Sequence, residues 1–156
     1  MEKGHRYIIR VAMIATIYLV LNILFSSISY GPIQVRIAEA LTVLPFLDVS
    51  AVLGLFLGCF LANLLGPVGM VDIIGGSLCT LIAAFFTSRV KNPKLAPLPP
   101  VLINALGVSI YLHLIFDLPY WATVLYIGIG QTIACYLLGY PLLLFLLKNK
   151  KRLPLG

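Results

Sequence analysis

Charged residues are scarce in this 156-residue chain, where Asp, Glu, Lys and Arg together make up only 10% of the sequence. A water-soluble globular domain carries about 25% charged residues. Hydrophobic residues reach 61% here, and the mean hydropathy is +1.06. Such a chain cannot cover its surface with polar groups, which excludes a soluble globular protein. We therefore expect an all-α integral membrane protein whose solvent is lipid.

The chain also lacks the short motifs on which many enzymes depend. It contains no HExxH, no GxSxG, no paired-cysteine motif and no phosphate-binding loop. An enzyme is therefore the least favoured interpretation, and we expect no metal and no cofactor. Because this sequence carries no nucleotide-binding motif, uptake against a gradient would need an ion gradient or a partner with an ATPase.

Only three cysteines are present, Cys59, Cys79 and Cys135, and each lies within an apolar run. Their spacing matches neither a metal site nor a disulfide framework. We interpret all three as small buried hydrophobic residues.

Apart from Arg36, the basic residues form three clusters at or beyond the ends of the apolar segments. The clusters are Lys3, His5, Arg6 and Arg10; Arg89, Lys91 and Lys94; and Lys148, Lys150, Lys151 and Arg152. Because Lys and Arg beside membrane spans stay on the cytoplasmic side, we expect all three clusters there. Membrane topology explains them without a nucleic-acid partner, so no nucleic-acid binding is expected.

Apolar runs and the breaks between them predict six transmembrane helices in one membrane domain, residues 1–156. About 20 apolar residues are needed to cross the hydrocarbon core. The predicted helices cover residues 7–28, 34–46, 50–65, 71–88, 97–116 and 120–147. We expect the first to be a retained span and not a cleaved signal peptide, since apolar character continues to residue 147.

The division of residues 34–66 into two helices decides this topology. As one helix the segment would be about 50 Å long, against a hydrocarbon core of about 30 Å. A break after Pro45 divides it, and an even number of crossings then separates the three basic clusters. Both termini are therefore predicted to be cytoplasmic, in a multi-pass protein of the bacterial cell membrane.

Several polar side chains share one depth in this topology, near the external face. They are Gln34, Arg36, Glu39, Asn63, Asp72 and Asn104. A charge at mid-bilayer costs roughly 2.5–3.5 kcal/mol or more, so such residues usually line a water-filled cavity or contact one another. The first interpretation is a polar cavity that opens outward.

The alternative interpretation is purely structural. Arg36 and Glu39 are three residues apart on a predicted helix and could simply neutralise each other. Asp72 could be favoured by the helix dipole at the start of its helix, and the two asparagines could link neighbouring helices. The pattern of residues leaves both interpretations open.

Small residues recur at every fourth position of the third predicted helix, namely Gly54, Gly58, Ala62 and Gly66. This spacing forms a flat ridge that another helix can approach closely, and we expect that contact to be internal. On the first helix, Ala12 and Thr16 form a shorter face of the same kind. Its partner could be a neighbouring helix or a separate protein.

Two segments carry a resemblance to a known family. GPIQVRIAEALTVLP (31–45) and LGLFLGCFLANLLGPVGMVDIIGGSL (53–78) closely resemble motifs of the QueT family of queuosine-precursor transporters. The resemblance extends over nearly the whole chain in length, span number and motif order. The matching positions are Gln34, Arg36, Glu39, Ala40, Leu41, Leu44 and Pro45 in the first motif, and Gly58, Asn63, Asp72 and Gly76 in the second.

The resemblance implies a six-helix S component of an energy-coupling factor (ECF) transporter, which binds its cargo near the external side. It implies as partners an EcfT-like coupling protein and two cytoplasmic ATPases. S components contact the coupling protein through small residues of the first helix, which here are Ala12, Ala15 and Thr16. The implied cargo is a 7-deazaguanine such as preQ1, or queuine.

The implied cargo suggests roles for the polar residues. A guanine-like edge offers N1–H and amine donors beside an acceptor, and preQ1 adds a cationic aminomethyl group. We hypothesise that Glu39 and Asp72 share the binding of the ring donors and of the cation. Arg36 would keep Glu39 ionised or close the site. Amide contacts are assigned to Gln34, Asn63 and Asn104, and aromatic stacking to one of Tyr30, Tyr111, Tyr120 or Trp121.

Two other functions compete with this hypothesis. An ion-coupled secondary transporter of a small polar solute would need paired broken helices or a relay of ionisable residues across the membrane. The predicted charges stop in the outer half, which argues against a relay. A structural or assembly subunit without cargo would require only the small-residue ridge.

Overall fold

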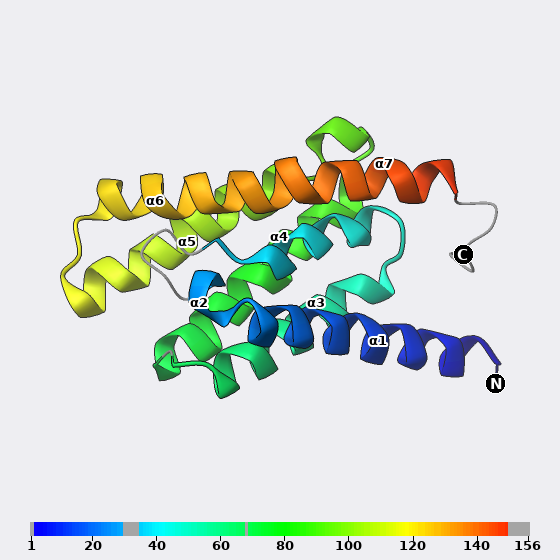
Figure 1. Cartoon of the computed structure of the whole chain (residues 1–156), viewed down its shortest axis with the longest axis horizontal. Coiled ribbons are helices and arrows are strands. Elements are labelled where there is room, and N and C mark those ends of the chain that lie inside the picture. Colours follow the sequence, from blue (N-terminus) through cyan, green and yellow to red (C-terminus); the bar gives the residue numbers. More distant parts are fainter. Residues whose placement is uncertain (1, 30–34, 68, 150–156) are drawn as a thin grey trace.

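All regular elements of the computed structural model are helices, as the sequence predicts; the structure describes residues 2–29, 35–67 and 69–149 (Figure 1). The α-helices are α1 (Glu2–Leu24), α2 (Ser26–Ser29), α3 (Ser50–Leu65), α4 (Ser77–Arg89), α5 (Leu98–Phe116), α6 (Tyr120–Thr132) and α7 (Tyr140–Lys148). Two 3₁₀-helices, η1 (Ile37–Phe46) and η3 (Pro93–Leu95), and two π-helices, η2 (Asp72–Gly76) and η4 (Ile133–Gly139), complete the described part.

Three continuous helical stretches in the described residues are long and apolar enough to cross a membrane. They are Gly4–Leu24, Pro93–Phe116 and Tyr120–Lys148. The apolar helices η1 and α3 are shorter, with 10 and 16 residues. At about 2.0 and 1.5 Å per residue they measure roughly 20 and 24 Å, less than the hydrocarbon core of about 30 Å. Six crossings with both termini inside therefore stay a prediction.

The predicted helix 34–46 differs from the structure in type. Its first residues lie outside the described part, and the rest forms the 3₁₀-helix η1. Pro45 lies inside η1 and explains the difference, because a proline ring clashes with the carbonyl four residues earlier in an α-helix. The Thr42 hydroxyl also donates to the Glu39 carbonyl at 2.5 Å, three residues back along the chain.

A second proline coincides with an irregularity in the last predicted helix. The stretch Tyr120–Lys148 is helical throughout, but its middle portion is the π-helix η4, which ends just before Pro141. Pro141 has no N–H for an α-helical bond to residue 137, and a wider turn relieves its clash with that carbonyl. Pro141 thus follows a π-helix that interrupts the α-helical geometry of this stretch.

The ridge of small residues on α3 packs against α1, which confirms that its contact is internal. A Cβ atom added at Gly54 would lie 2.8 Å from the Cβ of Ile14. One added at Gly58 would lie 2.8 Å from the Cβ of Tyr18 and 2.9 Å from the Ala15 carbonyl oxygen. The two backbones approach so closely that no side chain fits between them.

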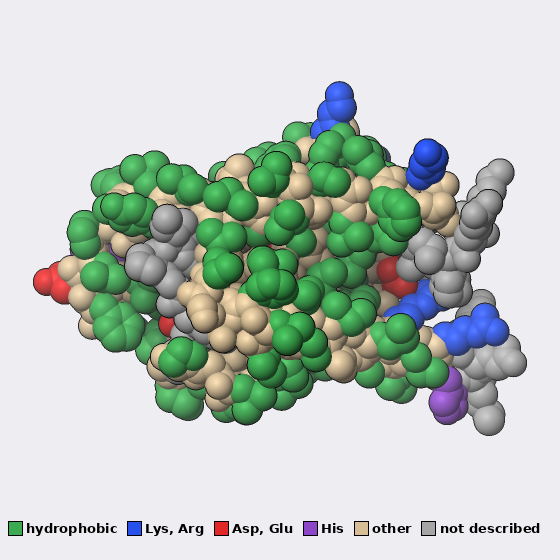
Figure 2. All heavy atoms as spheres, viewed as in Figure 1, with side chains coloured by type: hydrophobic (Ala, Val, Ile, Leu, Met, Phe, Trp, Pro, Cys, Tyr) green, Lys and Arg blue, Asp and Glu red, His purple; other side chains and the backbone are tan. Residues whose placement is uncertain are grey.

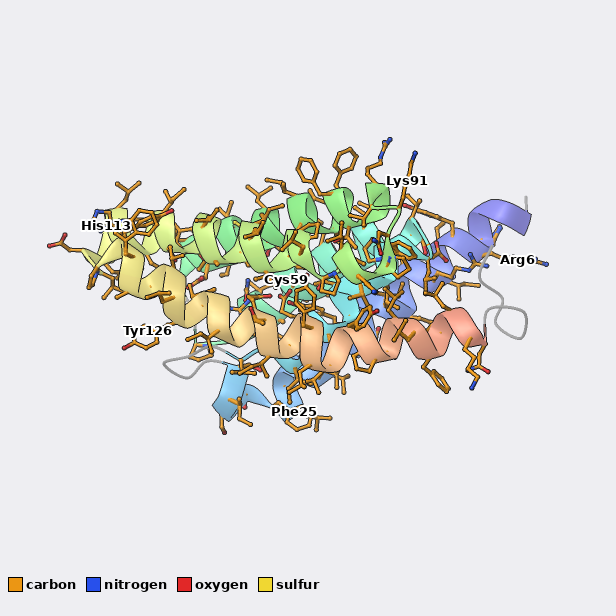
Figure 3. All side chains as sticks on the ribbon, turned by 90° about the horizontal axis from the view of Figure 1, so that it is seen from above. Arg6, Phe25, Cys59, Lys91, His113 and Tyr126 are labelled. Carbon is orange, nitrogen blue, oxygen red and sulfur yellow. The ribbon has the colours of Figure 1, made fainter. Side chains whose placement is uncertain are left out.

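The exposed surface is apolar along the bundle and charged toward its ends (Figure 2). Helix α1 begins and α7 ends at the same end, whereas the α5–α6 connection lies at the opposite end (Figure 1). Arg6 and Lys91 lie toward the first end and His113 toward the other (Figure 3). An apolar middle between polar ends is the surface expected of a protein embedded in lipid.

The close α1–α3 contact predicts that Gly58→Ala lowers the free energy of unfolding by roughly 1–3 kcal/mol, because the new methyl group meets backbone atoms. Gly128→Ala in α6 is the matched control, since its nearest neighbour would be 3.7 Å away. There the replacement should be neutral or stabilising by up to about 1 kcal/mol. Unfolding of both variants in detergent would be compared with the wild type; equal stability of the two would contradict the prediction.

Candidate functional site

A small polar cavity lies between η1, α4, α5 and the end of α6. Its lining residues are Arg36, Glu39, Gly76, Thr80, Asn104, Val108, Tyr111, Ile127 and Gln131. The free volume is ≈ 10 Å³, about what one water molecule requires. The cavity is therefore too small for a molecule the size of a purine, which would fit only if the walls moved apart.

The cavity reaches the middle of the bundle. Thr80, one of its lining residues, donates its hydroxyl hydrogen to the Cys59 sulfur at 3.4 Å. Cys59 lies near the centre of the long axis, between the ends occupied by Arg6 and His113 (Figure 3).

Glu39 is the most buried ionisable group of the cavity, with 1% of its surface exposed. Its Oε1 accepts a hydrogen bond from the Tyr18 hydroxyl of α1 at 2.5 Å, and its Oε2 accepts one from Asn104 Nδ2 of α5 at 3.3 Å. Both partners donate, and an ionised carboxylate is purely an acceptor. Two helices far apart in the sequence thus supply the donors that a buried carboxylate requires.

The backbone around Glu39 is bonded to η4. The Glu39 carbonyl accepts from the Thr42 hydroxyl and also from the Cys135 thiol of η4 at 3.5 Å. A Cβ atom added at Gly139 would lie 2.9 Å from the Ala40 carbonyl oxygen, so η1 and η4 are in close backbone contact. These contacts hold η1 against η4.

Asp72 lies one layer behind the cavity wall. Its Oδ1 accepts a hydrogen bond from the Tyr111 hydroxyl at 2.5 Å, and its backbone carbonyl accepts one from Asn63 Nδ2 at 3.0 Å. A Cβ atom added at Gly75 would lie 3.0 Å from the Tyr111 ring. The glycines of η2 therefore let the Tyr111 ring lie against the backbone, where it separates Asp72 from the cavity.

Arg36 balances part of this negative charge. It is buried, lines the cavity and interacts electrostatically with both Glu39 and Asp72. With all three groups ionised, two carboxylates and one guanidinium give a net charge of −1. In that state Arg36 and Glu39 balance each other within the cavity, and the excess negative charge belongs to Asp72 behind Tyr111.

The structure groups the predicted site residues in two layers. Arg36, Glu39 and Asn104 line the cavity, and Asp72 and Asn63 lie behind it around η2. Gln34 and Tyr30 lie outside the described residues. Of the other stacking candidates, Tyr111 lines the cavity, whereas Tyr120 and Trp121 pack against each other away from it.

The three residues predicted to contact a coupling protein do not lie on one face of α1. Ala12 and Thr16 are exposed on α1, but Ala15 is only 7% exposed and contacts α3 at Gly58. Small residues favour close helix contacts on either face, so their spacing alone could not distinguish an internal contact from an external one.

Sequence reasoning left three polar residues out of the site, namely Tyr18, Thr80 and Gln131. Tyr18 could have been identified from the sequence, because a tyrosine within an apolar helix needs a partner for its hydroxyl group. Its side chain is fully buried and bonds to Glu39. Thr80 and Gln131 line the cavity, but one polar residue on a membrane helix does not reveal which face it occupies.

Comparisons with known proteins agree with the resemblance seen in the motifs. The family described as QueT transporter matches residues 8–148. A protein of Lactococcus lactis subsp. cremoris (strain MG1363), named queuosine precursor transporter QueT, is 36% identical over 85 residues. That alignment covers 53% of this chain and 50% of the relative, so the chain spans about half the length of the relative it matches. No solved structure matches significantly.

The Tyr18–Glu39 hydrogen bond leads to a stability prediction. Tyr18→Phe removes one donor from a buried carboxylate and should cost about 1–3 kcal/mol of unfolding free energy. Tyr126→Phe removes a hydroxyl from an exposed tyrosine of α6 and should change stability little. Thermal unfolding in detergent measures both variants; a Tyr18→Phe protein as stable as the control would show that the bond contributes nothing.

Proposed function

Because this chain belongs to the QueT transporter family, we propose that it binds and imports a queuosine precursor, either a 7-deazaguanine such as preQ1 or queuine. The family is one of transporters and not of enzymes. The observation that carries the proposal is the buried polar cavity around Glu39 in an otherwise apolar bundle. Ionisable groups within a membrane protein are costly and typically mark a path or site for a polar solute.

The chemistry of the cavity supports this class of cargo. Tyr111 offers an aromatic ring, and Asn104, Gln131 and Arg36 offer groups that bond to the edge of a heterocycle. The net charge of −1 from Arg36, Glu39 and Asp72 favours the aminomethyl cation of preQ1 or the amine of queuine. In this proposal Asp72 approaches the cation once Tyr111 turns aside.

We further propose six crossings, with the end that carries Arg6 and Lys91 in the cytoplasm of a bacterial cell. The gathering of basic side chains at that end supports this orientation (Figure 3). Cargo would then reach the cavity from the opposite end, where α5 and α6 connect. Residues 117–119 form that connection.

The proposed mode of transport is that of an S component, with an EcfT-like coupling protein and two cytoplasmic ATPases as partners. The proposed contact on α1 is the exposed pair Ala12 and Thr16. The Thr16 hydroxyl donates to the Ala12 carbonyl at 2.8 Å. The pair therefore presents a flat surface of small side chains, with no unpaired hydroxyl hydrogen. Close approach of a partner helix needs such a surface.

Binding to the purified protein tests the cargo. We expect preQ1 and queuine to stabilise it against heat, and Asp72→Asn to weaken preQ1 binding roughly 10- to 150-fold, as for loss of a charged hydrogen-bond partner worth about 1.5–3 kcal/mol. Asp117→Asn is the matched control. Asp117 has a left-handed backbone (φ 52°), which asparagine also adopts, and lies at the end of α5. Unchanged preQ1 affinity in Asp72→Asn would contradict the role of Asp72.

Co-purification tests the partners. Thr16→Phe should prevent the coupling protein and its ATPases from co-purifying with the chain while leaving preQ1 binding intact. Thr132→Phe in α6 is the control, since Thr132 is also exposed and also bonds to the carbonyl four residues back. Uptake that an uncoupler abolishes, and that persists when the ATPases are inactivated, would instead favour an ion-coupled transporter.

A further inference from the structure

The two ends of the Asn104 amide have different surroundings. Nδ2 donates to Glu39 Oε2, whereas the carbonyl oxygen Oδ1 is buried and has no hydrogen-bond partner among the described residues. Asn104 is 3% exposed and lines the cavity. A buried carbonyl without a partner is costly, and such groups in folded proteins call for an explanation.

Glu39 determines which way this amide faces. An ionised carboxylate only accepts hydrogen bonds, so Asn104 must turn its NH₂ group toward Glu39 and its carbonyl group away. Tyr18 donates to the other carboxylate oxygen and fixes the orientation of the carboxylate itself. Both Glu39 oxygens therefore already accept a hydrogen bond from the protein, whereas the Asn104 acceptor has none.

Asn63 resembles Asn104 in its hydrogen bonding but differs in its position. Its Oδ1 is also buried without a partner, and its Nδ2 donates to the Asp72 carbonyl. Asn63 does not line the cavity, however, so its oxygen has no access to a bound molecule there. Among the described residues, Asn104 alone combines a place in the cavity wall with a buried, unpartnered side-chain acceptor.

We propose that Glu39 is a positioning residue that acts through Asn104, holding the amide so that its carbonyl oxygen accepts an N–H group of the cargo. The proposal rests on the proposed function and changes which residue binds which part of the cargo. The donors of the guanine-like edge are recognised by a neutral acceptor, and Glu39 contributes orientation and negative charge. The site therefore selects heterocycles that present N–H groups on that edge.

The selectivity between two ligands tests this role separately from stability. The probes are preQ1 and 7-aminomethyl-7-deazaadenine, which has the same cation but presents a ring acceptor where preQ1 presents N1–H. We expect the wild type to prefer preQ1 at least tenfold. In Glu39→Gln the amide at 39 can donate or accept, so Asn104 can take either orientation and the preference should fall toward unity.

Asp72→Asn is the matched control, because it also converts a carboxylate to an amide. It should weaken binding of both cationic ligands alike and leave their ratio unchanged. If Glu39→Gln also lowers both affinities equally and keeps the ratio, Glu39 does not act through Asn104. Should Glu39→Gln fail to fold, Asn104→Ala replaces it: loss of the preference supports the proposal, and a retained preference overturns it.

The wild-type measurement separates a failure of this inference from a failure of the proposed function. A wild-type protein that binds preQ1 selectively, with a ratio that Glu39→Gln and Asn104→Ala leave intact, overturns this inference alone. A wild-type protein that binds neither compound overturns the proposed function, and this inference with it.

Discussion

A buried carboxylate in an apolar bundle is the constraint on which the rest of this structure depends. Glu39 is almost completely excluded from solvent, and an isolated charge in such a place is very unfavourable. Tyr18 from α1 and Asn104 from α5 supply hydrogen bonds, and Arg36 supplies the opposite charge. These requirements fix where two long helices lie relative to η1, and they create a polar cavity as a consequence.

The irregular helices lie around the same carboxylate. Elements η1, η2 and η4 all depart from α-helical geometry, and all lie beside the cavity or directly behind its wall. Backbone groups inside a membrane must be hydrogen-bonded by the protein, so irregular turns are tolerated where they are buried. Side chains add hydrogen bonds to these turns: Thr42 and Cys135 donate to the Glu39 carbonyl, and Asn63 donates to the Asp72 carbonyl.

The sequence predicted those features that are revealed by a repeating pattern or by a polar residue that is unfavourable in lipid. Apolar runs predicted an all-helical protein, and Gly54 and Gly58 marked an internal helix contact because nothing larger fits there. Arg36, Glu39 and Asn104 were predicted to meet because isolated polar groups in lipid are unfavourable. The layer to which each residue belongs could not be predicted, since it depends on how far each helix is rotated. Asp72 behind Tyr111 and Ala15 against α3 are the two clearest cases.

The small volume of the cavity connects recognition with movement. A free volume of ≈ 10 Å³ cannot hold a heterocycle, so binding must separate walls that are now in contact. Displacement of Tyr111 would both enlarge the cavity and free Asp72, because Tyr111 lines the cavity and its hydroxyl bonds to Asp72. A cationic cargo can replace that hydroxyl as the partner of Asp72, whereas a neutral molecule cannot offer the same charge. Under the proposed function, opening of the site and selection of a positively charged cargo would be parts of one event, since the cation that is recognised would also stabilise the open state.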